Sequence, residues 1–125
     1  GTTDEWLARL ILEHSQPLRA ASLQRLKHHV GIIEESLPAL DGRLTWTRPE
    51  AGCVAFPLIA LGDGFDQHCL GETRIMLIPQ RCFVGCAEAG REGTQKILAG
   101  GIRLGYGLAD FPETWARFVE FLAHA

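Results

Sequence analysis

A single arginine stands in the apolar, glycine-rich segment AGGIRLGYGLAD, residues 99–110. Arg103 lies between Ile102 and Leu104, and a glycine follows on the far side of each of these two residues. Because successive side chains of a strand point to opposite faces, we expect the apolar neighbours to be buried and the arginine to lie on the other face. The glycines leave the guanidinium uncrowded, and its planar fork offers two parallel N–H donors to a carboxylate or phosphate. The pattern therefore predicts a binding site for a small anion.

A second interpretation of Arg103 stays open. Arginines are common on edge strands, and this chain has 15 aspartate and glutamate residues with which Arg103 could form a surface ion pair. Glycines near the end of a strand also mark β-bulges, so they need not serve a ligand. The residue pattern alone does not decide between an ion pair and a binding site.

The cysteines and histidines form no pattern typical of a metal site. The cysteines are Cys53, Cys69, Cys82 and Cys86. Cys82 and Cys86 lack the two-residue gap typical of zinc ligands, and no histidine pair lies near them. We expect reduced, buried thiols. His28 and His29 are neighbours on the polar side of a predicted helix, and we expect a solvated pair.

Composition limits the classes of partner. The chain has 125 residues and a net charge of −3, with 12 basic and 15 acidic side chains. So few scattered basic residues do not form the positive surface that binds nucleic acid or an anionic membrane. No apolar run approaches the ~18 residues needed to cross a bilayer, and no signal-peptide pattern opens the chain. We therefore expect a cytoplasmic protein that binds neither nucleic acid nor membrane.

Residues 1–42 follow a helical period. Pro17 is expected to break or kink the first helix of this segment. After it, apolar residues recur every three or four positions and so share one helix face. They are Leu23, Leu26, Val30, Ile33 and Leu37. The chain begins Gly-Thr-Thr, and its only methionine is Met76. We therefore expect a piece of a longer protein, in which residues 1–42 link a missing domain to the domain 43–125.

Residues 43–106 show the period of two that is typical of strands. Strands are expected in RLTWT (43–47), CVAFPLIAL (53–61), RIMLIP (74–79) and GIRLGY (101–106). The last segment, DFPETWARFVEFLAHA, predicts an amphipathic helix capped by Asp110, with Pro112 in its first turn. The fold class is therefore α+β: a small mixed or antiparallel sheet covered on one face by helices, with a long N-terminal helical segment and a C-terminal amphipathic helix.

Three segments together resemble the C-terminal small domain of the fold-type I (class I/II) pyridoxal-phosphate-dependent aminotransferases. They are WTRPEAGCVAFPLI, IMLIPQRCFVG and GIRLGYGLADFPETWARFVEFL. The family runs from a long helix through a Pro-x-Gly-Gly turn and an apolar strand ending in Pro-Gly to a strand with an isolated arginine and a final helix. The resemblance covers nearly the whole chain. This sequence departs from the pattern at Ala51-Gly52 and at Pro79-Gln80, which leaves the shapes of the loops facing the substrate open.

The resemblance implies a role for Arg103. In the family, the arginine of the last strand forms a bidentate pair with the substrate α-carboxylate, and Arg103 matches that position. The turn from Pro49 to Gly52 matches a turn near the substrate, and we assign it no chemistry. The resemblance thus implies part of an aminotransferase that transfers an amino group between an amino acid and a 2-oxo acid. It also implies a homodimer, because family members act as dimers.

The resemblance also implies that the cofactor is bound elsewhere. The lysine that holds pyridoxal phosphate, the phosphate-binding residues, the acidic partner of the pyridine nitrogen and the stacking aromatic group come from a large domain, and none is recognisable in this chain. We therefore expect the isolated chain to be inactive. In a competing interpretation, TQKILAGGIRLGY is the cofactor-lysine segment, with Lys96 as the Schiff-base lysine and Arg103 as a phosphate contact. Its spacing is one residue short and its place in the chain is wrong, so we predict a solvated lysine at Lys96.

Two non-catalytic alternatives stay open. The chain could be a free-standing module that shares this fold and binds a small ligand or a protein. It could also be a proteolytic or engineered fragment whose exposed face results from the cut. An upstream reading frame with the cofactor lysine favours the enzyme, whereas self-association through an apolar patch along Leu23, Leu26, Val30 and Ile33 favours the fragment.

Overall fold

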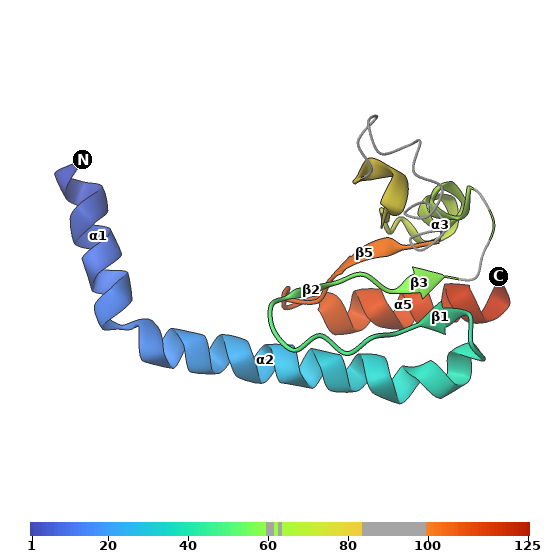
Figure 1. Ribbon diagram of the computed structural model, residues 1–125, viewed down its shortest axis with the longest axis horizontal. Coiled ribbons are helices and arrows are strands. Elements are labelled where there is room, and N and C mark those ends of the chain that lie inside the picture. The colour runs from blue at the N-terminus through green and yellow to red at the C-terminus, as the bar shows by residue number, and fades with distance from the viewer. Residues whose placement is uncertain (60–61, 63, 84–99) are drawn as a thin grey trace.

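The computed structural model describes residues 1–125 except 60, 61, 63 and 84–99. The helices within this part of the chain are α1 (Thr2–Glu13), α2 (Ser15–Ser36), α3 (Phe65–Thr73) and α5 (Phe111–His124), with short 3₁₀ helices at Leu37–Leu40 and Gln80–Cys82. The strands are β1 (Leu44–Thr45), β2 (Val54–Ala55), β3 (Leu58–Ile59), β4 (Ile78–Pro79) and β5 (Ile102–Gly105). Figure 1 shows their arrangement.

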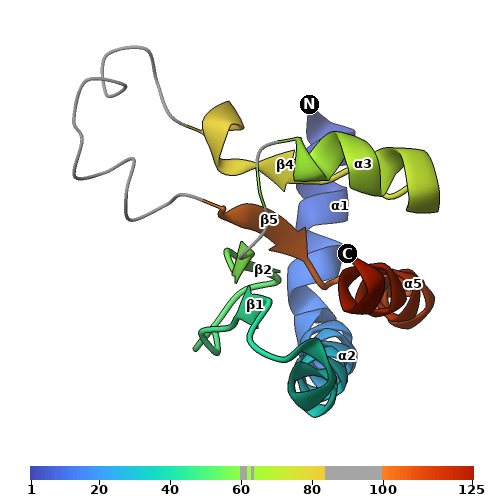
Figure 2. The same cartoon turned by 90° about the vertical axis from the view of Figure 1, so that its right-hand side faces the viewer.

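The strands are short and pair in two antiparallel sheets. Strand β5 is the middle strand of the first sheet, with β2 on one side and β4 on the other, and β1 pairs with β3 in the second. A bridge between Leu58 of β3 and Gly101, the residue before β5, joins the two sheets. Helices α2 and α5 lie on the same side of these strands (Figure 2). The predicted α+β class, with helices over one face of a small antiparallel sheet, is confirmed.

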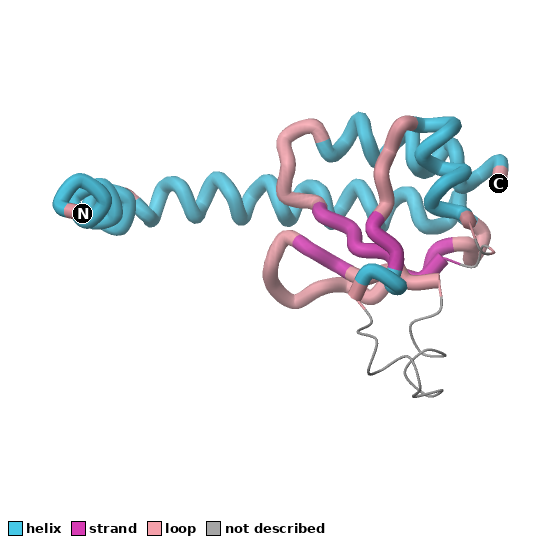
Figure 3. Tube along the Cα trace, turned by 90° about the horizontal axis from the view of Figure 1, so that it is seen from above, coloured by secondary structure: helices cyan, strands magenta, loops and turns pink. Residues whose placement is uncertain are grey.

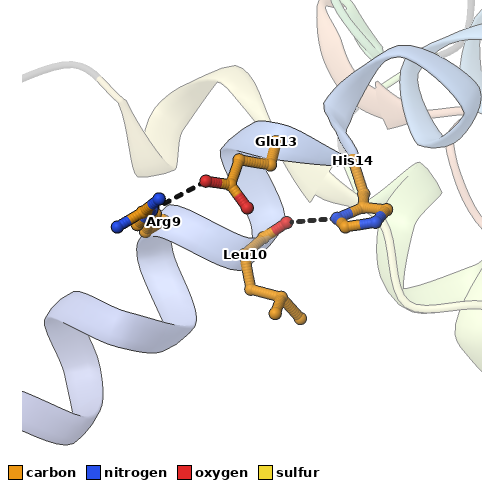
Figure 4. A network of polar contacts seen from close by, with 4 residues as sticks. All are labelled: Arg9, Leu10, Glu13 and His14. Atoms are coloured by element: carbon orange, nitrogen blue, oxygen red, sulfur yellow. Dashed lines mark hydrogen bonds and ion pairs between the residues drawn. The ribbon is translucent and has the colours of Figure 1, made fainter.

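The N-terminal helical segment bends sharply between α1 and α2, as Figures 1 and 3 show. The bend falls at His14, whereas Pro17 lies in the first turn of α2. A proline there is tolerated because the first N–H groups of a helix have no partner within the helix. At the end of α1, Arg9 Nε donates to Glu13 Oε1 at 2.7 Å and His14 Nδ1 lies 2.9 Å from the Leu10 carbonyl oxygen (Figure 4). The predicted break is confirmed.

Helix α5 and the second half of α2 enclose the core with the inner face of the sheet. The buried apolar side chains are Val30, Ile33, Leu40, Leu44, Ile59, Cys69, Ile102, Tyr106, Phe111, Trp115, Phe118 and Leu122. Trp115 Nε1 donates to Ser36 Oγ of α2 at 3.0 Å, so the buried indole N–H has a partner. The predicted apolar face of α2 packs here, with Leu23 left exposed.

The observed elements differ from the prediction between residues 47 and 83. The expected strand 53–61 is divided at Pro57 into β2 and β3, because a proline cannot donate to a strand ladder. Helix α3 was not predicted, since its glycine and its polar residues hide the helical period. Asp110 is the N-cap residue of α5 as predicted, but its side chain makes no capping hydrogen bond.

The sequence prediction for His29 was wrong. The His29 side chain is buried with 2% of its surface exposed, whereas His28 is exposed. His29 Nδ1 lies 2.7 Å from the carbonyl oxygen of Tyr106, the residue that follows β5. A carbonyl oxygen only accepts, so Nδ1 carries the proton and donates it. The His29 ring also lies 5.1 Å from the ring of Phe111, measured between centroids. His29 therefore attaches the end of β5 to α2.

The variant His29→Leu tests this attachment. Leucine keeps much of the volume but leaves the buried Tyr106 carbonyl without its donor, which is expected to lower the free energy of unfolding by about 1–3 kcal/mol. The matched control is His28→Leu, which makes the same change on the neighbouring exposed side chain and is expected to stay within about 0.5 kcal/mol of the parent. Urea denaturation followed by tryptophan fluorescence measures both. Equal losses in the two variants would contradict the assignment.

Candidate functional site

Arg103 occupies the middle of the central strand. Along β5 the side chains alternate as predicted: Ile102 is 3% exposed, Arg103 is exposed, and Leu104 is partly buried against the core. Tyr106, beyond the strand, returns to the buried side with 2% exposure. The prediction that the arginine lies on the face opposite the core is confirmed.

The strand register identifies the neighbours of Arg103 on that face. On the β4 side, Ile78 is paired directly with Arg103. On the β2 side, Val54 pairs with Gly105 and Leu58 bridges Gly101. Both pairs have the same register, so no residue is inserted between them and Phe56 lies opposite Arg103. Paired residues of antiparallel strands have their side chains on one face, close together. Arg103 therefore lies between Phe56 and Ile78.

The surroundings of Arg103 are open. A Cβ built onto Gly105 meets no atom within 4 Å, so this glycine faces free space beside the arginine. Among the ion pairs and side-chain hydrogen bonds of the described residues, none involves Arg103. In the described part of the chain, Arg103 therefore has no acidic partner of the kind that the alternative interpretation, a surface ion pair, requires. An exposed guanidinium with unused donors suits an incoming anion.

Gly100 controls the entry of the chain into β5. Its φ is +84°, and a Cβ at this position would lie 2.4 Å from the carbonyl oxygen of Ile59. Only glycine avoids both the strain and the clash. In return, Ile59 N–H donates to the Gly100 carbonyl at 2.9 Å. The glycines of this segment thus divide their roles: Gly100 is required by the fold, whereas Gly105 keeps space open.

Tyr106 connects the end of β5 to the turn that precedes β2. Its hydroxyl donates to the carbonyl of Gly52 at 3.0 Å, and its backbone N–H donates to the carbonyl of Cys53 at 2.9 Å. Gly52 has a φ of +87°, a conformation that favours glycine, at the end of the predicted Pro49–Gly52 turn. With His29 bound to its carbonyl, Tyr106 fixes the turn, the arginine-bearing strand and α2 to one another. The strand period of residues 101–106 predicts the burial of Tyr106 but not these hydrogen bonds.

The remaining candidate residues do not converge on a site. Burial raises the pKa of the Cys69 thiol, which keeps it protonated. Cys53 and Cys82 are exposed, so the expectation of buried thiols was wrong for these two. No group of histidine, cysteine, aspartate and glutamate residues that could hold a metal ion occurs among the described residues. Cys86 and Lys96 lie outside them.

Comparison with solved structures finds a similar fold in parts of two pyridoxal-phosphate-dependent enzymes. One similar structure is a PLP-dependent aminotransferase from Streptococcus suis 89-1591, with a TM-score of 0.72 and 22% identity; the match covers 99% of this chain and 30% of that one. Another is the PLP-dependent cyclase OrfR, with a TM-score of 0.67 and 23% identity, covering 94% of this chain and 31% of that one. The chain thus spans less than a third of each. No family model and no curated protein sequence matches it.

No helix among the described residues combines the length and the apolar character that spanning a membrane requires.

The environment of Tyr106 gives a prediction on pH. Burial raises its pKa above the usual value of 10.0, and the nearby Cys53 adds to the shift. The folded state therefore keeps a proton that the unfolded state loses, so stability contributed by the neutral phenol is present below about pH 10 and is lost as the pH rises through the folded pKa. Tyr106 is the only tyrosine of the chain. Absorbance titration of the phenol is expected to give a midpoint above that of the urea-unfolded chain.

The variant Tyr106→Phe is the companion measurement. It removes the hydroxyl that donates to Gly52 and is expected to lower the free energy of unfolding by about 0.5–1.5 kcal/mol at neutral pH. It should also remove the part of the alkaline loss of stability that belongs to the phenol. A native midpoint equal to that of the unfolded chain would contradict the buried, hydrogen-bonded phenol.

Proposed function

We propose that this chain is the C-terminal small domain of a fold-type I pyridoxal-phosphate-dependent aminotransferase, in which Arg103 binds the α-carboxylate of an amino acid and of a 2-oxo acid. The observation that carries the proposal is an exposed arginine, without an ion-pair partner among the described residues, in the middle strand of a fold that occurs in such enzymes. A guanidinium so placed pairs with two carboxylate oxygens at once.

The cofactor of the proposed enzyme is pyridoxal phosphate, but the described residues do not form a site for it. The lysine among them, Lys27, is exposed on α2, where no phosphate-binding loop accompanies it. The fit between these residues and the cofactor is therefore poor. We assign the cofactor lysine and its partners to a large domain of the same protein, and we expect the 125-residue chain alone to be inactive.

Helix α1 offers the surface on which that large domain would pack. Figure 1 shows α1 projecting from the rest of the chain, and none of its residues is buried. Trp6 is 62% exposed, and Leu7, Leu10 and Ile11 lie exposed on the same face. An apolar stripe of this kind normally packs against another element. The face of α2 that carries Val30 and Ile33, in contrast, packs on the small domain itself.

We further propose that the full protein is a cytoplasmic homodimer that binds amino-acid and 2-oxo-acid substrates, in keeping with the family that the sequence resembles. We propose no contact of this chain with nucleic acid or membrane. The solved neighbours carry two chemistries by name, an aminotransferase and a cyclase. Amino-group transfer is the reaction that we propose, because the sequence resembles the aminotransferases.

Substitution of Arg103 tests the proposed role. In the full-length protein encoded by the gene, Arg103→Gln is expected to lower kcat/KM for the amino acid about 10- to 100-fold, since it removes a charge-assisted pair to the substrate. Arg103→Lys keeps the positive charge but loses the planar fork of the guanidinium, so its kcat/KM is expected to lie between those of the parent and of Arg103→Gln. Arg117→Gln, an exposed arginine on α5, is the matched control. Unchanged steady-state kinetics in Arg103→Gln would overturn the role.

Reduction with borohydride tests the proposed place of the cofactor lysine. The 125-residue chain is incubated with pyridoxal phosphate, reduced and mapped by peptide mass. Lys27 and Lys96 are its lysines, and we expect no stoichiometric adduct on either, because the proposal assigns the cofactor lysine to the large domain. Stoichiometric labelling at Lys96 with little at Lys27 would make this segment the cofactor-bearing one and overturn the assignment.

A further inference from the structure

Apolar side chains surround Arg103, although binding of a simple anion would not require them. The register places Phe56 and Ile78 on either side of the arginine, with Val54 opposite Gly105. Phe56 is 37% exposed and Val54 is 38% exposed, although both are large apolar residues. None of these neighbouring positions carries a charge, so Arg103 is a cation set in an apolar surface.

A second aromatic ring extends this surface. The ring of Phe83 meets that of Phe56 edge to face, with 5.7 Å between their centroids, and Phe83 is 52% exposed. An aromatic pair in this geometry is favourable in itself. The two rings come from segments far apart in the sequence, one following β2 and the other following the 3₁₀ helix Gln80–Cys82. Together with Arg103, they form what we call the Arg103–aromatic surface, defined as Arg103, Phe56, Ile78 and Phe83.

The backbone that leads to Phe83 is held by contacts of that 3₁₀ helix. Gln80 N–H donates to the Gly101 carbonyl at 2.8 Å and so continues the pairing with β5. Arg81 pairs with Asp66 of α3 at 2.5 Å, and this hydrogen bond and charge hold the pKa of the Asp66 carboxyl below its usual value. Phe83 N–H donates to the Gln80 carbonyl at 2.8 Å. The ring therefore stands beside Phe56 because its backbone is held there.

We propose that the carboxylate bound by Arg103 belongs to a molecule with an apolar, preferably aromatic, group, which lies against Phe56 and Phe83. This inference rests on the proposed function and specifies its substrate class. A bound apolar group removes the exposed aromatic surface from water, and the same contact excludes water from the guanidinium–carboxylate pair. A second carboxylate on the ligand, in contrast, would lose hydration against the apolar rings.

The first experiment measures binding to the 125-residue chain with chemically matched probes. Propanoate and its phenyl derivative, hydrocinnamate, share the carboxylate, and succinate adds a second one. NMR titration at constant ionic strength follows the Arg103 Nε–H signal together with the ring signals of Phe56 and Phe83. We expect hydrocinnamate to bind about tenfold more tightly than propanoate, because about half of its ring surface leaves water. Succinate should bind no more tightly than propanoate.

Variants separate the two parts of the surface. Phe83→Ala is expected to remove most of the advantage of hydrocinnamate while leaving propanoate unchanged, and Phe56→Leu should reduce that advantage with less risk to folding. Leu108→Ala, which truncates an apolar side chain that is 70% exposed, is the control. Arg103→Gln should weaken both carboxylates.

The outcomes distinguish this inference from the proposed function. Equal affinities for propanoate and hydrocinnamate, both lost in Arg103→Gln, would overturn the apolar contact and leave the carboxylate role of Arg103 intact. Hydrocinnamate binding that is unchanged in Arg103→Gln would overturn the carboxylate role and with it the inference. Titrations in which no probe moves the Arg103 signal would overturn both.

Discussion

The buried hydrogen bond from His29 to the carbonyl of Tyr106 attaches the end of the arginine-bearing strand to α2. Without it, a carbonyl inside the core would have no donor, at a cost comparable to a substantial part of the stability of a small domain. The same tyrosine holds the turn at Gly52 with its hydroxyl and Cys53 with its backbone N–H. One residue therefore ties α2, β5 and the turn before β2 together. Arg103 itself is placed by the register of β5, which pairs with β2 on one side and with β4 on the other.

Local patterns allowed much of the fold to be predicted. The alternation of Ile102, Arg103 and Leu104 needs only the period of a strand, and the amphipathic C-terminal helix needs only the spacing of its apolar residues. Both were confirmed because each was set by neighbours in sequence. The break near Pro17 was also predicted. The bend falls at His14, however, and Pro17 is accommodated in the first turn of α2.

Contacts between residues far apart in the sequence could not be predicted from local patterns. That Phe56 lies opposite Arg103 depends on register across some 50 residues of chain, which no local pattern encodes. His29 was assigned to the polar side of its helix, although it lies three residues after Leu26 and four before Ile33, on the face that packs on the core. Its hydrogen-bond partner, 77 residues away, could not be predicted from a local pattern. Helix α3 was missed because a short, glycine-containing segment carries too weak a period. For the candidate site, the arginine could be predicted, whereas its aromatic surroundings could not.

Pro79 has a consequence for the edge of the sheet. In β4, Ile78 and Gln80 direct their hydrogen bonds toward β5, so the intervening residue faces outward. That residue, Pro79, has no backbone N–H, so the outer edge of β4 lacks the donor that pairing with another strand would need. Unpaired edges are templates for fibril growth, and prolines interrupt them. At this edge of the three-stranded sheet, Pro79 therefore disfavours the addition of a further strand.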